Sequence, residues 1–220
     1  MSDRIRVLIV DDDALVRSGL RMMLSGSERV DIVAEAQDGT EVLAAVDAHR
    51  PDVVLMDLRM PRLDGLAATA LLKGQPRAPH VLVLTTFDAD ELVLRALRAG
   101  AEGFVLKDTP PAEIIRAIEL VAAGEGILSP TVARQLIAHV AGDGTAIEDR
   151  RSAARRRLDG LTERELDVAR AVGQGKTNAD IAGELYMSVA TVKAHMTRLL
   201  SKLEVQNRVQ IALLVNDADL

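Results

Sequence analysis

The chain has 220 residues, of which 48% are hydrophobic and 27% charged, and its formal net charge is −6. That length suits one large domain or two modest ones, and the apolar fraction excludes a disordered chain. The absence of cysteine excludes disulfides, cysteine-ligated zinc and thiol catalysis, and the three aromatic residues leave little on which single-stranded nucleic acid stacks.

Short β-branched runs alternate with helix-period stretches through the first half of the chain. The runs are apolar on both faces, as strands buried in a parallel sheet are, and they cover residues 5–10, 32–36, 53–56, 81–84 and 103–106. Helices are predicted between them, with Gly100 and Gly124 as stop signals, at 14–24, 40–49, 66–73, 91–99 and 112–123. This order predicts a doubly wound α/β domain over 1–126, with a five-stranded parallel sheet and a ligand site at the carboxyl ends of its strands.

The pattern weakens over residues 127–160, where we predict a linker that contains one short helix near 131–140. Gly142, Gly144 and a cluster of arginines indicate an exposed segment. The cluster comprises Arg150, Arg151, Arg155, Arg156 and Arg157. It is either a solvated tether or an auxiliary arm that contacts phosphates, and both interpretations stay open.

Only helix signals occur over residues 161–220. Three helix starts are marked by capping residues, namely Thr162 with Glu165, Thr177 with Asp180, and Ser188. An apolar stripe at helical spacing follows over 189–203, and a last helix is predicted over 208–215. Four short helices predict a small all-α domain, in which two closely joined helices form a helix-turn-helix.

Polar side chains follow four of the predicted strands at the point where each ends, namely Asp11, Asp12, Asp13, Asp57, Thr85 and Lys107. Carboxylates gathered at one sheet edge repel one another unless a cation joins them, and hard oxygen ligands favour Mg²⁺. A carboxylate can attack phosphorus to form an acyl phosphate, while a lysine neutralises the phosphoryl oxygens. A nearby hydroxyl can hydrogen-bond one of those oxygens. Together these residues predict a phosphoryl-transfer site.

Four motifs resemble, in order, those of the receiver domain of two-component response regulators: VLIVDD (7–12), MDLRMPRLDG (56–65), LTTF (84–87) and GFVLK (103–107). The resemblance implies a flavodoxin-like fold in which Asp57 accepts phosphate from a sensor histidine kinase. It also implies a Mg²⁺ ion held by Asp11, Asp12, Asp57 and the backbone carbonyl of Arg59. A receiver of this kind is not an enzyme, beyond its own phosphotransfer and slow dephosphorylation.

The resemblance further implies a switch. Thr85 and Lys107 match residues that contact the phosphoryl group, and Phe104 matches an aromatic whose rotamer changes with the threonine. Phosphorylation adds negative charge and acceptor oxygens, so it is expected to draw Thr85 inward and to let Phe104 turn inward behind it. Asp13 adds charge beside the site, and its role stays open.

The outer face of the predicted helix 189–203 is basic and carries no acid; its polar residues are Lys193, His195, Thr197, Arg198 and Lys202. Such side chains contact phosphates and base edges. Residues 161–215 resemble the LuxR-type helix-turn-helix of the NarL/FixJ family of regulators. The resemblance makes this helix the recognition helix, with Lys193, Ala194 and Thr197 facing bases. It places four further residues near the DNA backbone, namely Lys176, Thr177, Thr191 and His195.

The predicted helix 208–215 matches one that often pairs two DNA-binding domains. Its apolar residues Val209, Ala212 and Leu213 fit either a dimer contact or the core of the domain itself. The sequence as a whole therefore predicts a transcription factor in which phosphorylation leads to dimerisation or to release of the helix-turn-helix. The active homodimer is expected to bind double-stranded DNA at a pseudo-palindromic operator.

Three alternatives stay open. A phosphohydrolase of the haloacid dehalogenase type would use Asp11 as nucleophile. A LuxR regulator that senses a small ligand would normally have a pocket rich in aromatics, whereas this half offers only Phe87 and Phe104. A receiver that never uses phosphate is the third.

The net charge does not argue against a DNA partner, because it is unevenly distributed. Residues 1–126 carry 14 Lys and Arg against 21 Asp and Glu, whereas the predicted recognition helix has bases and no acid. No segment approaches the ~18 consecutive apolar residues of a membrane span, and the polar start is unlike a signal peptide. We therefore expect a cytoplasmic protein without membrane insertion.

Overall fold

The computed structural model describes residues 4–85, 90–128 and 144–219, and the chain divides into two compact units, 1–133 and 134–220. Each unit has a hydrophobic core of its own. The helix expected near 131–140, Gly142 and Phe87 lie outside the described residues.

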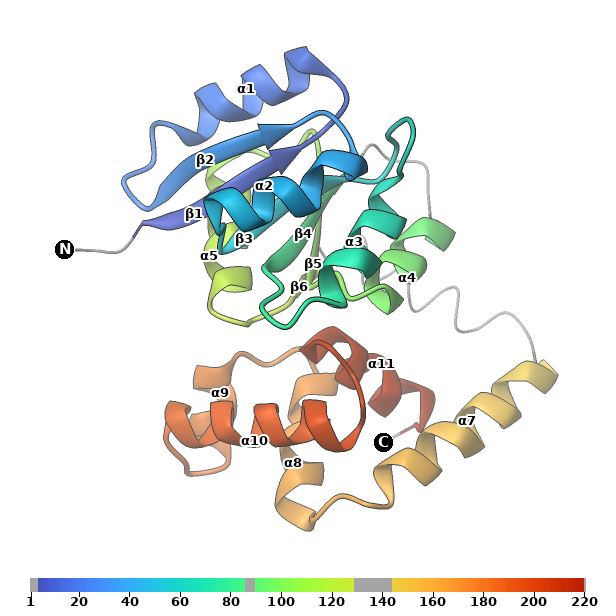
Figure 1. The fold of residues 1–220 in the computed structure, drawn as a ribbon. Coiled ribbons are helices and arrows are strands. Elements are labelled where there is room, and N and C mark those ends of the chain that lie inside the picture. Colours follow the sequence, from blue (N-terminus) through green and yellow to red (C-terminus); the bar gives the residue numbers. More distant parts are fainter. Residues whose placement is uncertain (1–3, 86–89, 129–143, 220) are drawn as a thin grey trace. The chain divides into compact units, whose positions relative to one another are not determined.

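Six parallel strands form the sheet of the first unit, in the order β2-β1-β3-β4-β5-β6 (Figure 1). Their bounds are β1 (Ile5–Val10), β2 (Val30–Ala36), β3 (Val53–Asp57), β4 (His80–Thr85), β5 (Gly103–Leu106) and β6 (Ile127–Leu128). The five predicted strands are confirmed. The sixth lies in the range predicted as a linker, because two residues are too few to show a periodic pattern. The strand order reverses at β1, and this reversal opens the ligand-binding crevice of such sheets at the carboxyl ends of β1 and β3.

Five α-helices of the described residues flank this sheet: α1 (Ala14–Leu24), α2 (Val42–His49), α3 (Gly65–Lys73), α4 (Asp90–Arg98) and α5 (Pro111–Ala122). Side chains alternate across a strand, so Val7 and Ile9 pack in one core with residues of α1 and α5. Leu8, Val10 and Phe104 are buried as well, and the alternation of side chains puts them on the opposite face of the sheet. The helix expected at 40–49 begins instead as a 3₁₀ turn, η1 (Gly39–Glu41).

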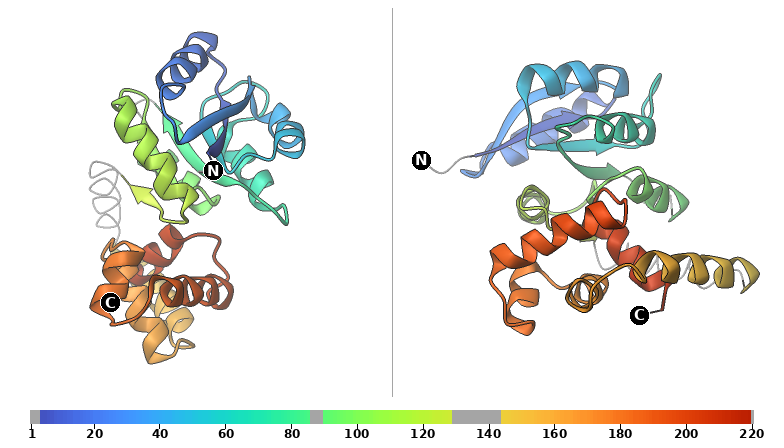
Figure 2. Two further views of the ribbon diagram at one scale, coloured as in Figure 1. Left: turned by 90° about the vertical axis from the view of Figure 1, so that its left-hand side faces the viewer. Right: turned by 60° about the horizontal axis from the view of Figure 1, so that its bottom comes forward.

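In the part that the structure describes, the second unit contains α7 (Gly144–Leu158), α8 (Glu163–Gly173), α9 (Asn178–Glu184), α10 (Val189–Lys202) and α11 (Arg208–Asp217), seen in Figure 2. The four helices predicted from residue 161 onward are confirmed. Both capping boxes form, and Ser188 caps α10 by accepting from the Thr191 amide. Val168, Ile181, Val192, Leu199 and Ile211 are fully buried in one core.

Helix α7 corrects the expectation of an exposed linker. Ala154 and Leu158 are four residues apart, so they lie on one face of α7, and both are buried in the core of the second unit. These two apolar residues stand among arginines, and for that reason the sequence pattern was weak.

Three of the arginines of α7 bind groups within the second unit, so this segment is not a solvated tether. Arg155 donates to the Ala218 carbonyl at 3.0 Å, Arg157 donates to the Leu203 carbonyl, and Arg151 pairs with Asp219 at 2.6 Å. Leu203 and Ala218 are the C-caps of α10 and α11. Guanidinium groups therefore satisfy carbonyls at two helix ends, where cations are favourable. Arg156 is exposed, and the side chain of Arg150 lies outside the description.

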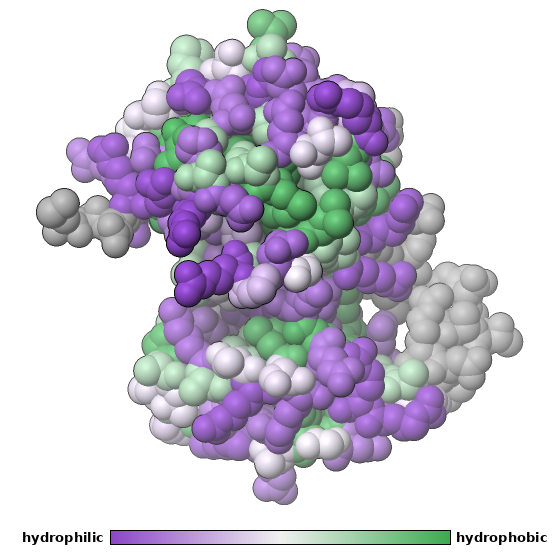
Figure 3. Space-filling model, viewed as in Figure 1, coloured by the Kyte–Doolittle hydropathy of each residue, from purple (hydrophilic) through white to green (hydrophobic). Residues whose placement is uncertain are grey.

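The visible face of both units is largely hydrophilic, with scattered apolar residues (Figure 3). Within the described residues, no helix combines the length and apolar character that crossing a membrane requires.

Candidate functional site

Three carboxylates meet at the carboxyl edge of the sheet. Asp11 follows β1 and Asp57 ends β3, and β1 and β3 pair directly. One oxygen from each of Asp11, Asp12 and Asp57 lies within 4.8 Å of the others. Asp11 and Asp57 are buried, whereas Asp12 is exposed. Oxygen ligands this close, with one side open, fit a hard divalent cation with room for water or substrate.

Lys107 follows β5 and reaches both buried carboxylates. Its Nζ lies 2.6 Å from Asp11 Oδ2 and 3.1 Å from Asp57 Oδ2. Burial alone lowers the pKa of Lys107, but the two carboxylates outweigh it and hold the pKa above its usual value. The ammonium therefore stays charged and contributes one positive charge where the carboxylates crowd.

Burial raises the pKa of the Asp57 carboxyl, and Asp11 adds to this effect, while Lys107 and the Leu58 amide oppose it. The Leu58 N–H donates to Asp57 Oδ1 at 2.8 Å, which orients the side chain. Burial is the largest of these effects, so Lys107 offsets only part of the cost of the charged form. A divalent cation between the carboxylates would stabilise the charged form further.

Thr85 and Phe104 lie on the neighbouring strands, as predicted. Thr85 ends β4 and is buried, and its carbonyl accepts the Lys107 amide at 2.9 Å. Phe104 pairs in register with Val83, and its ring is 2% exposed. The ring is thus already inside in this structure, whereas the expected switch brings it inward after phosphorylation. Arg59, the proposed carbonyl ligand, is exposed in the loop after β3.

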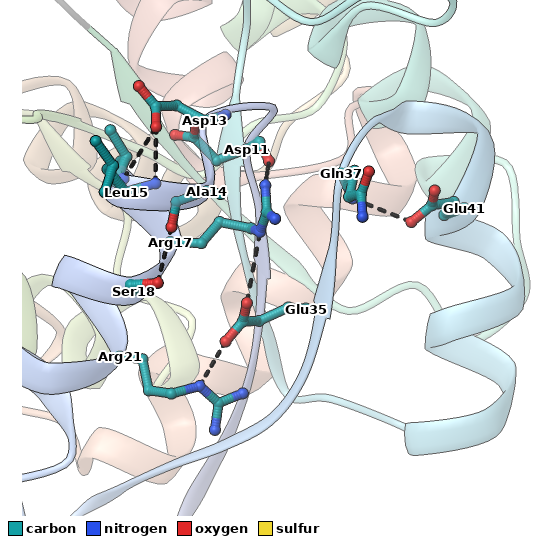
Figure 4. Close-up of polar contacts among 11 residues, drawn as sticks. Asp11, Asp13, Ala14, Leu15, Arg17, Ser18, Arg21, Glu35, Gln37 and Glu41 are labelled. Atoms are coloured by element: carbon teal, nitrogen blue, oxygen red, sulfur yellow. Dashed lines mark hydrogen bonds and ion pairs between the residues drawn. The ribbon is translucent and has the colours of Figure 1, made fainter.

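Asp13 has a role that the sequence left open. Its Oδ1 accepts the Leu15 amide at 2.7 Å and the Val16 amide at 3.4 Å, so it is the N-cap of α1 (Figure 4). Asp13 therefore starts the helix that follows the acidic turn and is not in the carboxylate cluster.

The loop between β3 and α3 is braced from the side by the turn after β2. Asp38 is fully buried and pairs with Arg62, whose φ of 62° is left-handed. The Gly39 amide donates to the Leu63 carbonyl at 3.2 Å. The sequence gives no signal for this contact, because its partners are about two dozen residues apart and no motif links them.

At the opposite edge of the sheet, the buried Glu102 joins two elements. Lys73 Nζ lies 2.8 Å from Glu102 Oε1, and His80 Nδ1 lies 2.7 Å from Oε2. Burial by itself raises the pKa of Glu102, but the contacts with His80 and Lys73 leave it below its usual value. The sequence did not single out this group either; it anchors α3 to the starts of β4 and β5 and is remote in register from the acidic site.

The residues proposed to contact DNA divide into two groups. On α10 the exposed ones form the outer face opposite Val192 and Leu199, and they are Thr191, Lys193, Ala194, Thr197, Arg198 and Lys202. His195 is half-buried, and its Nδ1 has no hydrogen-bond partner among the described residues. Lys193 and Arg198 have no ion pair within the described part of the chain.

Three of the proposed DNA contacts, Lys202 among them, have partners within the second unit. Lys202 Nζ lies 2.6 Å from Glu165 Oε2, and Lys176 pairs with Glu184. Thr177 is half-buried and caps α9 through its hydroxyl. The buried Arg208, which the sequence did not single out, donates to the Lys176 carbonyl at 2.5 Å and so holds the turn before α9.

The proposed dimer face on α11 is partly used inside the protein. Val209 is buried, and Ala212 packs against the core of the second unit, whereas Leu213 is half-exposed. Burial of Val209 and Ala212 favours the core interpretation for these two residues.

A doubly wound domain with clustered carboxylates and a lysine, followed by a helix-turn-helix, defines a regulator that couples a chemical signal to DNA. Two families match the chain. The response regulator receiver domain matches residues 7–119, and the bacterial regulatory proteins of the luxR family match residues 159–215. The chain therefore belongs to the two-component response regulators and carries a LuxR-type DNA-binding domain. This membership leaves the phosphohydrolase and ligand-sensing alternatives without support.

Individual relatives match over nearly the whole chain. The uncharacterized transcriptional regulatory protein YxjL of Bacillus subtilis is 38% identical, over 94% of this chain and 93% of its own. The transcriptional regulatory protein LiaR of Bacillus subtilis is 37% identical, over 94% and 95%. Among solved structures, the response regulator ChrA of a heme-sensing two-component system is 33% identical, covers 98% of both chains and superposes with a TM-score of 0.55.

Proposed function

We propose that Asp57 accepts a phosphoryl group from a sensor histidine kinase, with Mg²⁺ held by Asp11, Asp12, Asp57 and the carbonyl of Arg59. The observation that carries this is the placement of Lys107 Nζ 2.6 Å from Asp11 and 3.1 Å from Asp57, beside the carboxylate cluster. Mg²⁺, when bound, neutralises charge on the transferring phosphoryl oxygens.

Residues of the chain itself have distinct roles in the proposed transfer. The Leu58 amide orients Asp57 through Oδ1, so an Asp57 oxygen attacks phosphorus as the bond from phosphorus to the kinase imidazole breaks. Lys107 pairs with the developing charge, and the Thr85 hydroxyl donates to a phosphoryl oxygen. The imidazole leaves with the electron pair of the broken bond, and an aspartyl phosphate remains. The same site supports slow dephosphorylation by water.

The phosphate is expected to act through Thr85 and Phe104 on the second unit. The Phe104 ring is already buried in this structure. Phosphorylation is therefore expected to increase the fraction of molecules in which the ring points inward. The active homodimer, formed through residues such as Leu213, then places two copies of α10 on a pseudo-palindromic operator. The ranges 1–126, 127–160 and 161–220 remain our proposed functional division of the chain, in a cytoplasmic protein.

Uptake of phosphate from a small acyl phosphate, followed by intact mass, tests the acceptor. Asp57→Asn should take up no phosphoryl group, because an amide is not a nucleophile here. Asp13→Asn is the matched control, since Asp13 caps α1 outside the carboxylate cluster and should leave uptake unchanged. Phosphorylation of Asp57→Asn at the wild-type level would refute the assignment.

A further inference from the structure

Arg17, on α1, reaches back to the acidic turn. Its guanidinium Nη1 donates to the backbone carbonyl of Asp11 at 2.7 Å, and its Nε lies 3.4 Å from Glu35 Oε2 on β2 (Figure 4). The Arg17 side chain is only 11% exposed. A guanidinium held this way is oriented from two sides by partners on different elements.

The carbonyl that Arg17 holds belongs to the peptide between Asp11 and Asp12. Because the peptide is planar, its orientation fixes the position of the Asp12 Cα, and therefore of the Asp12 side chain, relative to Asp11. The other polar groups of Asp11 are also engaged: its amide donates to Ala36, Oδ1 accepts the Asp13 amide and Oδ2 lies against Lys107. Arg17 therefore supplies the contact that fixes the link between two carboxylates of the cluster.

The charge of Arg17 has a second effect. Three consecutive aspartates repel one another at the end of β1, and a largely buried guanidinium beside them offsets part of that repulsion. Lysine would not replace it, because a single ammonium lacks the planar fork that binds a carbonyl and a carboxylate together.

We propose that Arg17 is a positioning residue for the cation of the acidic site. It orients the Asp11–Asp12 peptide so that both carboxylates meet one Mg²⁺ ion. The inference rests on the proposed function, because it assigns a supporting residue to the same metal site. It makes Arg17 a partner of the ligands and not a ligand.

Calorimetric titration of the full chain with Mg²⁺ tests the proposal. Arg17→Ala should weaken Mg²⁺ binding ~10-fold, in the range that loss of a supporting partner of metal ligands costs. Arg17→Lys should be intermediate. Arg21→Ala is the matched control: Arg21 also pairs with Glu35, at 2.5 Å, but it is half-exposed and has no contact with Asp11. Its Mg²⁺ affinity should change by less than ~2-fold.

The phosphorylation rate against Mg²⁺ concentration separates positioning from general damage. Arg17→Ala should need more Mg²⁺ but reach a near wild-type rate at saturation, whereas a misfolded variant would not recover. If Arg17→Ala does not fold, Arg17→Lys alone decides by its Mg²⁺ affinity. Wild-type affinity in the foldable variants overturns the proposal. Absence of Mg²⁺ binding by the wild type instead refutes the proposed function, and this inference with it.

A different observation concerns Tyr186, in the turn between α9 and α10. Tyr186 is 95% exposed and has a left-handed φ of 53°. A left-handed φ is energetically costly for any residue that has a Cβ. The exposed ring buries no apolar surface that would offset this cost. Within the described second unit, the exposed large apolar side chains are Tyr186 and Val189, and both flank the N-terminus of α10. That end of a recognition helix meets the DNA.

We infer that the Tyr186 hydroxyl donates to a backbone phosphate of DNA when α10 enters the major groove. Tyrosine is among the side chains that make such contacts, and they add affinity without reading sequence. A mixed-sequence duplex is therefore a sufficient probe, and the operator itself is not needed.

Titration of the full chain with that duplex at several salt concentrations provides the test. Tyr186→Phe should weaken binding ~5-fold without changing the salt slope, because a neutral donor releases no counterion. Lys193→Ala, by contrast, should lower the slope by about one. Tyr186→Gly should raise the melting temperature while weakening DNA binding. Unchanged DNA affinity in Tyr186→Phe overturns the inference, including the case in which the ring contacts another protein.

Discussion

Gly65, the first residue of α3, lies directly against the backbone of the proposed phosphate acceptor. A Cβ at this position would stand 2.0 Å from the Asp57 carbonyl oxygen and 2.9 Å from Leu58 Cα. No flexible side chain takes part in the clash, so the backbone of the acceptor loop would have to move. Position 65 therefore requires glycine for steric reasons, because any larger residue would displace the backbone that carries Asp57.

We expect Gly65→Ala to lower the free energy of unfolding by ~2–3 kcal/mol and to slow phosphorylation. Gly74→Ala is the control, because its Cβ would meet the nearest atom at 3.5 Å, an ordinary contact. Urea unfolding and phosphate uptake of both variants check this. Equal stability of the two variants would contradict the steric argument.

Glu165 illustrates how one buried carboxylate couples to pH. Its contact with Lys202, the Thr162 amide and the Thr162 hydroxyl lower the pKa of Glu165 from 4.5 to about 2. The folded state therefore holds the proton less tightly than the unfolded state. This contribution to stability is complete above pH 4.5 and is lost as the pH falls toward 2.

Glu165→Gln should make the free energy of unfolding less dependent on pH below pH 4.5. At neutral pH the free energy of unfolding should fall by roughly 1–2 kcal/mol, a modest loss because Lys202 is half-exposed and screened by solvent. Denaturant unfolding between pH 2 and 7 measures the effect. Glu163→Gln, an exposed residue of the same helical turn, should leave the curve unchanged. An acid limb equally steep in wild type and Glu165→Gln would show that the lowered pKa of Glu165 contributes nothing to stability.

At the scale of elements, α7 is held to the second unit by guanidinium groups at helix ends. Arg155→Ala and Arg157→Ala each leave a C-cap carbonyl without its donor, so each should lower the free energy of unfolding by about 1 kcal/mol. Arg156→Ala is the control within the same run, since Arg156 is exposed and makes no hydrogen bond or ion pair among the described residues.

The same three variants test the phosphate-contacting arm. If the arginine run bound DNA, Arg156→Ala would weaken DNA binding and reduce its salt slope by about one. We expect it to do neither, with stability losses confined to the other two variants. A fluorescence anisotropy titration against a DNA duplex distinguishes these outcomes.

At the scale of the whole molecule, the two units have separate cores, and among the described residues the carboxylate cluster lies in the first unit alone. A cation that binds the folded first unit stabilises that unit by mass action. Calorimetry of the full chain should therefore show two transitions, of which Mg²⁺ shifts only one upward by several degrees. A single transition that moves as a whole would mean that the units unfold as one.

Much of the fold and of the candidate site was predictable from the sequence. The five long strands, the helices between them and the gathering of Asp11, Asp12 and Asp57 follow from hydrophobic period and from chain order. The contacts of Arg17 and Arg157 were not predictable. Each guanidinium binds a backbone carbonyl, and every residue offers a carbonyl, so no side-chain pattern marks the partner.

The sequence by itself determined that parallel strands end in acids and a lysine, and that a basic helix follows a tight turn, because periodicity and local capping are properties of neighbouring residues. Only the tertiary structure decided which polar groups form hydrogen bonds or ion pairs with distant parts of the chain. Lys202 pairs with Glu165, and arginines of α7 bind the C-cap carbonyls of α10 and α11. Such partners are chosen by packing between distant segments, which sequence spacing does not encode.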